Sequence, residues 1–211
     1  MIRQADVDAV AEAARAVPPA EGNYIEDDFV MNLLATVIDY RQNTTAVVRA
    51  LEHFKEHRWD AIRTGEDLEQ VMAGFTDDQE GNTGLAQYLW GYNLWTRAKQ
   101  LRDLTAYFRR IGVIDQQSLK RWAKGSDFKR DFEGRVKGLG IAVYHWLVMR
   151  QGVDTVKPDV HVRRFAEKAV GRPLGDEDVV YLVVKAAHQL GMKAYELDWA
   201  IWEHSRGGPP S

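Results

Sequence analysis

The feature that most restricts the fold of this chain is a Gly-Leu-Gly turn at positions 138–140, placed between two apolar segments. In the segment before the turn, apolar residues recur every four positions, the period of one helical face; they are Phe128, Phe132 and Val136. The segment 141–149 after the turn is apolar and rich in aromatic residues. The pattern predicts a helix through Val136, a tight turn and a second helix.

The two glycines of this turn, Gly138 and Gly140, favour close approach of a ligand to the backbone. Glycine reaches conformations that other residues avoid, and it leaves the neighbouring N–H groups uncovered. The start of a helix attracts an anion, and Lys137 adds a full positive charge at the same place. The turn therefore suits a phosphate group, although many Gly-x-Gly sequences are ordinary turns between helices.

A carboxylate, Asp159, follows Pro158 at the start of the next predicted helix. An aspartate at such a position is ordinarily an N-cap, which accepts hydrogen bonds from the first N–H groups of the helix. A carboxylate can also stabilise a developing positive charge and orient or deprotonate a water molecule. The residue type and position agree with either role.

The net charge of −3 hides a strong asymmetry along the chain. Positions 1–91 contain 7 Lys/Arg and 17 Asp/Glu, positions 92–150 contain 13 and 5, and positions 151–211 contain 8 and 9. The basic excess thus coincides with the segment that holds the turn, where a phosphate backbone would need it. The alternative is a solvated basic helix face without a ligand.

Length and composition predict a folded chain with its own core, because 45% of the 211 residues are hydrophobic. No apolar run reaches the roughly 20 residues that span a bilayer, and the acidic N-terminal segment lacks a secretory pattern. The absence of cysteine excludes disulfides and a cysteine-ligated iron–sulfur cluster. We therefore expect a monomeric cytoplasmic protein without a membrane partner.

The remaining segments predict further helices and no strand, which indicates an all-α fold of about ten helices. Positions 76–83 are polar and acidic and predict a loop. A predicted helix over 44–59 carries His53 and His57 four residues apart, a spacing that can hold a metal. No third ligand lies nearby in the sequence, so no side-chain metal site is expected.

The turn and Asp159 together resemble the helix-hairpin-helix (HhH-GPD) DNA glycosylases, the superfamily of endonuclease III. In that family a hairpin grips DNA through its phosphates, and an aspartate beyond it acts at the sugar of a flipped-out nucleotide. Gly140 and Asp159 are 19 positions apart, which is similar to the family spacing. The segments 29–42 and 91–101 also resemble the family's early apolar helix and its short turn with a basic helix.

The resemblance implies a role for each matching residue. Asp159 would be the catalytic carboxylate, and Gln42 would fill the gap that the flipped nucleotide leaves in the duplex. The other implied DNA contacts are Lys137, Gly138, Leu139, Gly140, Ile141, Ala142, His161 and Arg163. For His161 and Arg163, orientation of Asp159 or ion pairs with neighbouring acids are equal alternatives.

Two departures from the family narrow the expected chemistry. Members that also cleave the DNA strand carry a Schiff-base lysine two residues after the second glycine, and this chain has Ala142 there. Other members end in a four-cysteine iron–sulfur loop, which a chain without cysteine cannot form. The resemblance therefore implies a monofunctional glycosylase without an iron–sulfur cluster or another cofactor. It leaves open a monovalent cation bound by the backbone carbonyls of the hairpin.

An extruded base needs aromatic rings to stack on, which contribute about 1–3 kcal/mol per base. Four aromatic residues near the implied site qualify, although most aromatics at helical spacing belong to a core; they are Tyr92, Trp95, Tyr144 and Trp146. The implied activity is base-excision repair of double-stranded DNA by hydrolysis of the N-glycosidic bond of a damaged or mispaired base. Electron-rich rings favour an alkylated purine, although the same rings would serve almost any purine, and oxidised or deaminated bases stay open.

The family fold implies two helical lobes with the hairpin and Asp159 at the cleft between them. We expect a central lobe over 23–146 and a second lobe from 1–22 and 147–211. A nucleoid-associated location would follow from DNA binding. Two other classes remain open: a non-catalytic helix-hairpin-helix protein that binds abasic or damaged duplex, and a helical interaction or hydrolase fold in which the glycines only form a turn.

Overall fold

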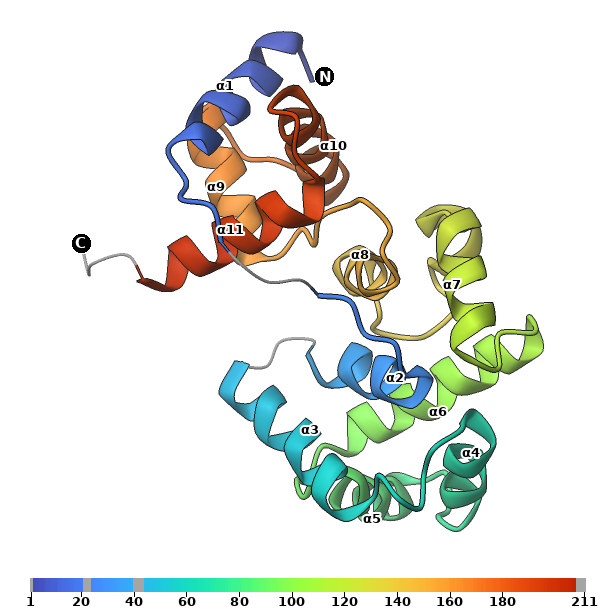
Figure 1. Cartoon of the computed structure of the whole chain (residues 1–211). Helices are drawn as coiled ribbons and strands as arrows, with labels where there is room; N and C mark the ends of the chain where they lie inside the picture. Colours follow the sequence, from blue (N-terminus) through green and yellow to red (C-terminus); the bar gives the residue numbers. More distant parts are fainter. Residues whose placement is uncertain (1, 21–23, 40–43, 208–211) are drawn as a thin grey trace. The chain divides into compact units, whose positions relative to one another are not determined.

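The computed structural model describes residues 2–20, 24–39 and 44–207, and no strand occurs among them, so the fold is all-α (Figure 1). None of the helices in these ranges is long and apolar enough to cross a membrane. The helices, in chain order, are α1 (Gln4–Arg15), α2 (Phe29–Ile38), α3 (Thr44–His57), α4 (Gly65–Ala73), α5 (Gln79–Trp90), α6 (Trp95–Arg110), α7 (Gln116–Gly125), the π-helix η1 (Phe128–Phe132), α8 (Ile141–Arg150), α9 (Val160–Val170), α10 (Asp176–Gln189) and α11 (Ala194–Gly207).

The chain divides into two compact units. Unit 1 consists of Met1–Ile25 and Val148–Ser211, and unit 2 consists of Glu26–Leu147. Unit 1 contains α1, α9, α10 and α11, so segments from both ends of the sequence build it. Unit 2 contains α2 to α7, η1 and the first part of α8.

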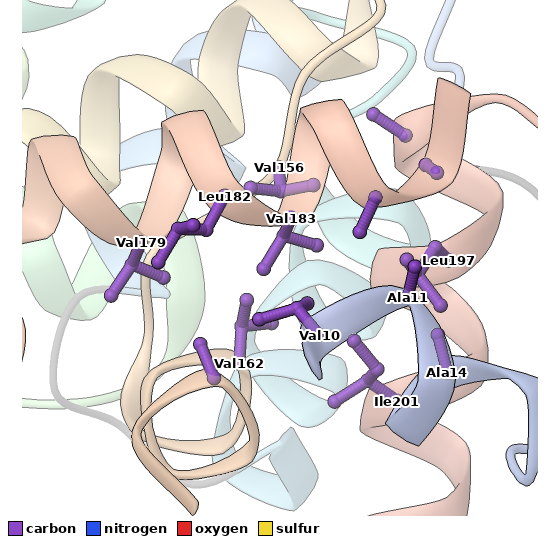
Figure 2. Packing of buried hydrophobic residues seen from close by; sticks show 14 of the residues in the cluster. Val10, Ala11, Ala14, Val156, Val162, Val179, Leu182, Val183, Leu197 and Ile201 are labelled. Atoms are coloured by element: carbon purple, nitrogen blue, oxygen red, sulfur yellow. The ribbon is translucent and has the colours of Figure 1, made fainter. Parts of the chain in front are cut away.

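One hydrophobic core holds unit 1 together (Figure 2). It takes Val10 from α1, Val162 from α9, Leu182 from α10 and Leu197 from α11, and each of these side chains is at most 1% exposed. Val156, in the loop before α9, is fully buried in the same core. The loop that leads into α9 is therefore packed against the helices and does not lie loose on the surface.

Unit 2 is built around α2. All ten residues of this helix are buried, because both its apolar run and its two polar residues face other elements. The amide of the buried Asn32 donates hydrogen bonds of 2.9 Å to the carbonyl oxygens of Glu26 and Asp28, which satisfies its polar atoms inside the unit. Helices α3, α4 and α6 pack against α2.

The acidic segment 76–83 is a loop only in its first part, so the prediction of a loop throughout is wrong. Asp78 is the N-cap of α5 and accepts a 2.8 Å hydrogen bond from the N–H of Gly81. Asn82 is buried and donates a 2.7 Å hydrogen bond to the carbonyl of Asp78. The polar composition here belongs to a capped helix start, in which Asp and Asn satisfy free backbone groups.

Asp6 ties the start of α1 to the rest of unit 1. Its carboxylate accepts hydrogen bonds of 3.0 Å from the backbone N–H of Arg3 and from the guanidinium of Arg172. The bonds from Arg3, more than that from Arg172, hold the pKa of Asp6 at about 2, below its usual value of 3.8. The ionised carboxylate therefore stabilises the folded chain.

Asp6→Asn should lower the free energy of unfolding at pH 7 more than at pH 3. A carboxyl whose folded pKa is depressed contributes stability above the unfolded pKa of about 4, and this contribution falls as the pH drops toward 2. Urea unfolding of both proteins at the two pH values measures the effect. Asp60→Asn, at a carboxylate whose side chain is 99% exposed, is the control. The same difference between wild type and Asp6→Asn at both pH values would contradict the assignment.

Candidate nucleic-acid-binding site and candidate catalytic carboxylate

The Gly-Leu-Gly turn lies in unit 2, between η1 and α8. η1 ends at Phe132, so the prediction of a helix through Val136 is wrong in its second half. Glu133 has a ψ of 126° and Gly134 a φ of 70°, and these values take the backbone out of the helix. Val136 is nevertheless buried, so the four-residue spacing marks one buried side of the segment and not a continuous helix.

The backbone conformation at position 138 favours glycine, and a Cβ atom there would displace the end of a neighbouring side chain. The φ of Gly138 is 84°, which lies in the left-handed region, where other residues are strained. A Cβ atom there would also lie 2.7 Å from Nε2 of Gln100, which donates a 3.2 Å hydrogen bond to the carbonyl of Lys137. The hydrogen bond between Gln100 and the carbonyl of Lys137 attaches the turn to α6.

Gly140 accepts the first helical hydrogen bond of α8, from the N–H of Tyr144 at 3.0 Å. The N–H groups at the start of α8, including those of Ile141 and Ala142, therefore precede the helical ladder. Lys137 is exposed beside them. Backbone donors, the helix dipole and a side-chain cation together suit an anion such as a phosphate. The side chain of Leu139 is buried, so this residue can offer a ligand only its backbone.

Asp159 lies in unit 1 as the N-cap of α9. Its Oδ1 accepts hydrogen bonds from the N–H groups of His161 at 2.8 Å and Val162 at 3.1 Å. Within the described part of the chain, Oδ2 of Asp159 accepts no hydrogen bond, and the residue is partly exposed. The capping role is therefore real, and it leaves one carboxylate oxygen uncommitted.

A chain of hydrogen bonds holds the backbone just before Asp159. The N–H of Asp159 donates to the carbonyl of Lys157 at 2.7 Å, and the N–H of Lys157 donates to Oδ1 of Asp198 at 2.7 Å. Oδ2 of Asp198 accepts a 3.1 Å hydrogen bond from the hydroxyl of Tyr24. Burial, above all, raises the pKa of Asp198 to about 7. The negative charge of Asp159 acts in the same direction, whereas the hydrogen bond from Lys157 opposes it.

Asp198 was missed by the sequence reasoning. It lies in α11, far along the chain from Asp159, and no motif surrounds it. The available signal was an acidic residue on the apolar face of a helix, since its neighbours Leu197 and Ile201 belong to the core. Burial of a carboxyl group costs free energy. An acidic residue at a core position therefore indicates a specific structural or functional role.

His161 and Arg163, implied as DNA contacts, both have partners inside unit 1. Nδ1 of His161 lies 2.9 Å from the hydroxyl of Ser205 in α11. Arg163 donates a 2.8 Å hydrogen bond to the carbonyl of Leu174 and forms an ion pair with Asp176. Of the alternatives for Arg163, the structure therefore displays the ion pair with a neighbouring acid.

Of the four predicted base-stacking residues, Tyr92 lines a pocket formed by described residues of unit 2. The pocket has a volume of about 620 Å³, and Arg49 and Asn93 are among its other lining residues. Tyr92 is 39% exposed and Trp95 is 37% exposed, but Trp95 does not line the pocket. Trp146 is half-buried and lies outside it as well. Among the described residues, this pocket therefore contains one of the four predicted stacking residues.

Tyr144 belongs to the packing beneath the hairpin. Its side chain is buried, and its hydroxyl donates a 2.9 Å hydrogen bond to the carbonyl of Ser126. Its ring packs against the rings of Trp122, Phe128 and Phe132. A ring held in this way cannot turn to stack on a base, so we withdraw Tyr144 from the base pocket.

Two further expectations concern the chain near α3. Gln42, implied as the residue that fills the gap in the duplex, lies outside the described residues.

His53 and His57 are neighbours, with ring centroids 4.6 Å apart, and burial, more than the charge of His57, lowers the pKa of His53. In the described ranges, no group of three or more His, Cys, Asp or Glu side chains is placed to hold a metal ion.

Comparison with known proteins identifies the family. A family model described as a domain of unknown function, DUF8548, matches residues 33–206. The chain belongs to the DUF8548 family. The matched range of the DUF8548 domain includes the hairpin turn, Asp159 and Asp198. No curated protein and no solved structure shows a significant match to this DUF8548 chain.

Proposed function

We propose that this protein is a monofunctional DNA glycosylase that hydrolyses the N-glycosidic bond of a damaged or mispaired base in double-stranded DNA. The observation that carries the proposal is the carboxylate of Asp159, which keeps Oδ2 uncommitted while Oδ1 is held by two backbone N–H groups. The role of this carboxylate is inferred from the resemblance to the helix-hairpin-helix glycosylases, in which an aspartate lies at a similar spacing from the hairpin.

The proposed reaction needs a fixed negative charge beside the sugar. As the bond between the sugar carbon and the base nitrogen breaks, the sugar becomes cationic and the base leaves with the electron pair. In the proposed step, Oδ2 of Asp159 stabilises this cation and accepts a proton from the water molecule that adds to the sugar carbon. Capping of α9 through Oδ1 supports this role, since it leaves the carboxylate little freedom to rotate.

DNA binding is assigned to the hairpin and the basic segment that contains it. The N–H groups at the start of α8 and the ammonium group of Lys137 would meet phosphates of one strand. Tyr92 remains the stacking candidate, because it is partly exposed and lines a pocket with Arg49. An alkylated purine is the proposed base, since an electron-poor ring stacks well on tyrosine.

The test of the activity is incubation with duplexes that each carry one lesion, followed by alkali, which cleaves the strand at abasic sites. We expect strand cleavage after alkali for at least one lesion and none without alkali. Borohydride should trap no covalent adduct, because the position of the Schiff-base lysine is occupied by Ala142. Trapping of an adduct would contradict the monofunctional assignment.

Lys137→Ala should weaken DNA binding to all sequences by a similar factor. Loss of one phosphate contact should reduce the slope of log K against log salt concentration by about 0.9. Fluorescence anisotropy with a labelled duplex at several salt concentrations measures this slope. Lys185→Ala, which removes an exposed lysine of α10 whose ammonium lies over the ring of Tyr181, is the matched control and should leave the slope unchanged. An unchanged slope in Lys137→Ala would remove the hairpin lysine from the interface.

The second candidate function is DNA binding without chemistry. The capping role of Asp159 favours it, because two hydrogen bonds to the start of α9 are a sufficient structural reason for an aspartate there. This function predicts affinity for abasic or nicked duplex and no release of any base. The lesion panel and the binding measurement together distinguish the two functions.

A further inference from the structure

Asp198 is a buried carboxyl group in the part of unit 1 that carries Asp159. It is 3% exposed, and its two hydrogen-bond donors are the N–H of Lys157 and the hydroxyl of Tyr24. No ion pair to Asp198 occurs among residues 2–20, 24–39 and 44–207. Burial of a carboxyl without a cation destabilises a fold, and an apolar residue of similar size is usually at least as stable. The position of Asp198 therefore calls for a reason other than stability.

The reason lies in the backbone that Asp198 holds. The N–H of Lys157 donates a hydrogen bond to Oδ1 of Asp198, and the carbonyl of Lys157 accepts a hydrogen bond from the N–H of Asp159. On either side of Lys157, Val156 and Pro158 are buried. The carboxyl of Asp198 thus sets the direction of the short segment from which Asp159 projects.

A second aspartate fastens the same loop farther from the candidate catalytic group. Oδ1 of Asp154 accepts a 2.7 Å hydrogen bond from the N–H of Ala194, and its Oδ2 lies 2.8 Å from Nε2 of His188. Asp154 thereby attaches the loop to the start of α11 and to α10. The loop has two anchors of similar chemistry, and Asp198 is the one next to Asp159.

We propose that Asp198 is a positioning residue, which holds the Lys157–Asp159 segment so that Oδ2 of Asp159 faces the substrate. The inference rests on the proposed glycosylase function. It assigns Asp198 no contact with DNA. Its effect passes through the backbone of Lys157 and the orientation of Asp159.

Burial and the charge of Asp159 also affect the ionisation of Asp198. Burial, above all, and the negative charge of Asp159 raise the pKa of Asp198 to about 7, against the effects of the hydrogen bonds from Lys157 and Tyr24 and of the Lys157 ammonium. A folded pKa above the unfolded value of about 4 means that stability is lost as the pH rises from 4 to 7. Asp198→Asn should remove this part of the pH dependence of unfolding.

The decisive experiment compares Asp198→Leu with Asp198→Asn in single-turnover base release. Leucine removes the acceptor for the N–H of Lys157, and the resulting misplacement of Asp159 should lower the rate by about 10²-fold, with unchanged affinity for DNA. Asparagine keeps an acceptor oxygen and should restore most of the rate. Asp154→Asn is a control at the other anchor, which removes the charge beside His188 and keeps an acceptor for the N–H of Ala194, and it should retain the wild-type rate. A wild-type rate in Asp198→Leu, or an equal loss in Asn and Leu, would overturn the proposal.

Amide hydrogen exchange separates this inference from the proposed activity. The N–H groups of Lys157 and Asp159 should exchange faster in Asp198→Leu than in wild type, and Asp198→Asn should stay close to wild type. If wild type releases no base from any duplex, the glycosylase function fails, and the proposed effect of Asp198 on base release fails with it. Unchanged exchange in Asp198→Leu would instead refute the positioning itself, whatever the activity.

Discussion

Asp159→Asn should lower the rate of base release by about 10²–10³-fold and leave the affinity for lesion-containing duplex nearly unchanged. In the proposed mechanism, the substitution removes the negative charge that stabilises the cationic sugar. It keeps a side-chain oxygen for the N–H groups of His161 and Val162, so the cap of α9 should persist. Single-turnover kinetics on the best duplex of the lesion panel measures the rate, and fluorescence anisotropy measures the affinity.

Two further variants make the result specific. Asp159→Ala removes the charge and also the cap, which should cost a further ~0.5–2 kcal/mol of stability. Asp115→Asn alters another N-cap aspartate, which accepts a 2.7 Å hydrogen bond from the N–H of Ser118 at the start of α7, and it should not affect base release. Equal base release by Asp159→Asn and wild type would leave Asp159 as a cap only and remove it from the mechanism.

Leu182→Ala should lower the free energy of unfolding by about 2–5 kcal/mol, the largest stability effect that we predict. Leu182 is fully buried in the core of unit 1, among the side chains of α1, α9 and α11 (Figure 2). Truncation removes apolar surface from the core and leaves a cavity that the rigid helices can close only in part. Urea unfolding followed by circular dichroism measures the loss.

The neighbouring residue supplies the control for this core substitution. Tyr181 precedes Leu182 in α10 but is 50% exposed, and Tyr181→Ala should change the stability by no more than about 0.5 kcal/mol. A loss below about 1 kcal/mol in Leu182→Ala would contradict the packing of α10 onto the core. Since α9 packs on the same core, a large loss of stability in Leu182→Ala would also indicate that this core holds α9 and its N-cap Asp159 in place.

The candidate site was predictable where its geometry depends on near neighbours in the chain. Gly138 adopts a positive φ inside a turn, and Asp159 caps the helix that follows it, as glycine and aspartate commonly do. Tyr144 was predicted to stack on a base, yet its hydroxyl bonds to Ser126, and for Arg163 the resemblance left a DNA contact and an ion pair equally open, of which the ion pair with Asp176 is present. An aromatic or basic side chain at helical spacing has the same periodicity whether it faces a ligand or another helix.

Local sequence was sufficient for the all-α class, for the start of α2 and for the capped start of α9, because helix period, capping and turn chemistry act over about four residues. The contacts that hold the candidate catalytic carboxylate are of another kind. Tyr24 and Asp198 meet across most of the length of the chain, and Asp198 then binds the N–H of Lys157. Such pairs exist only after helices from both ends of the chain have packed on one core, since burial, and not spacing, brings them together.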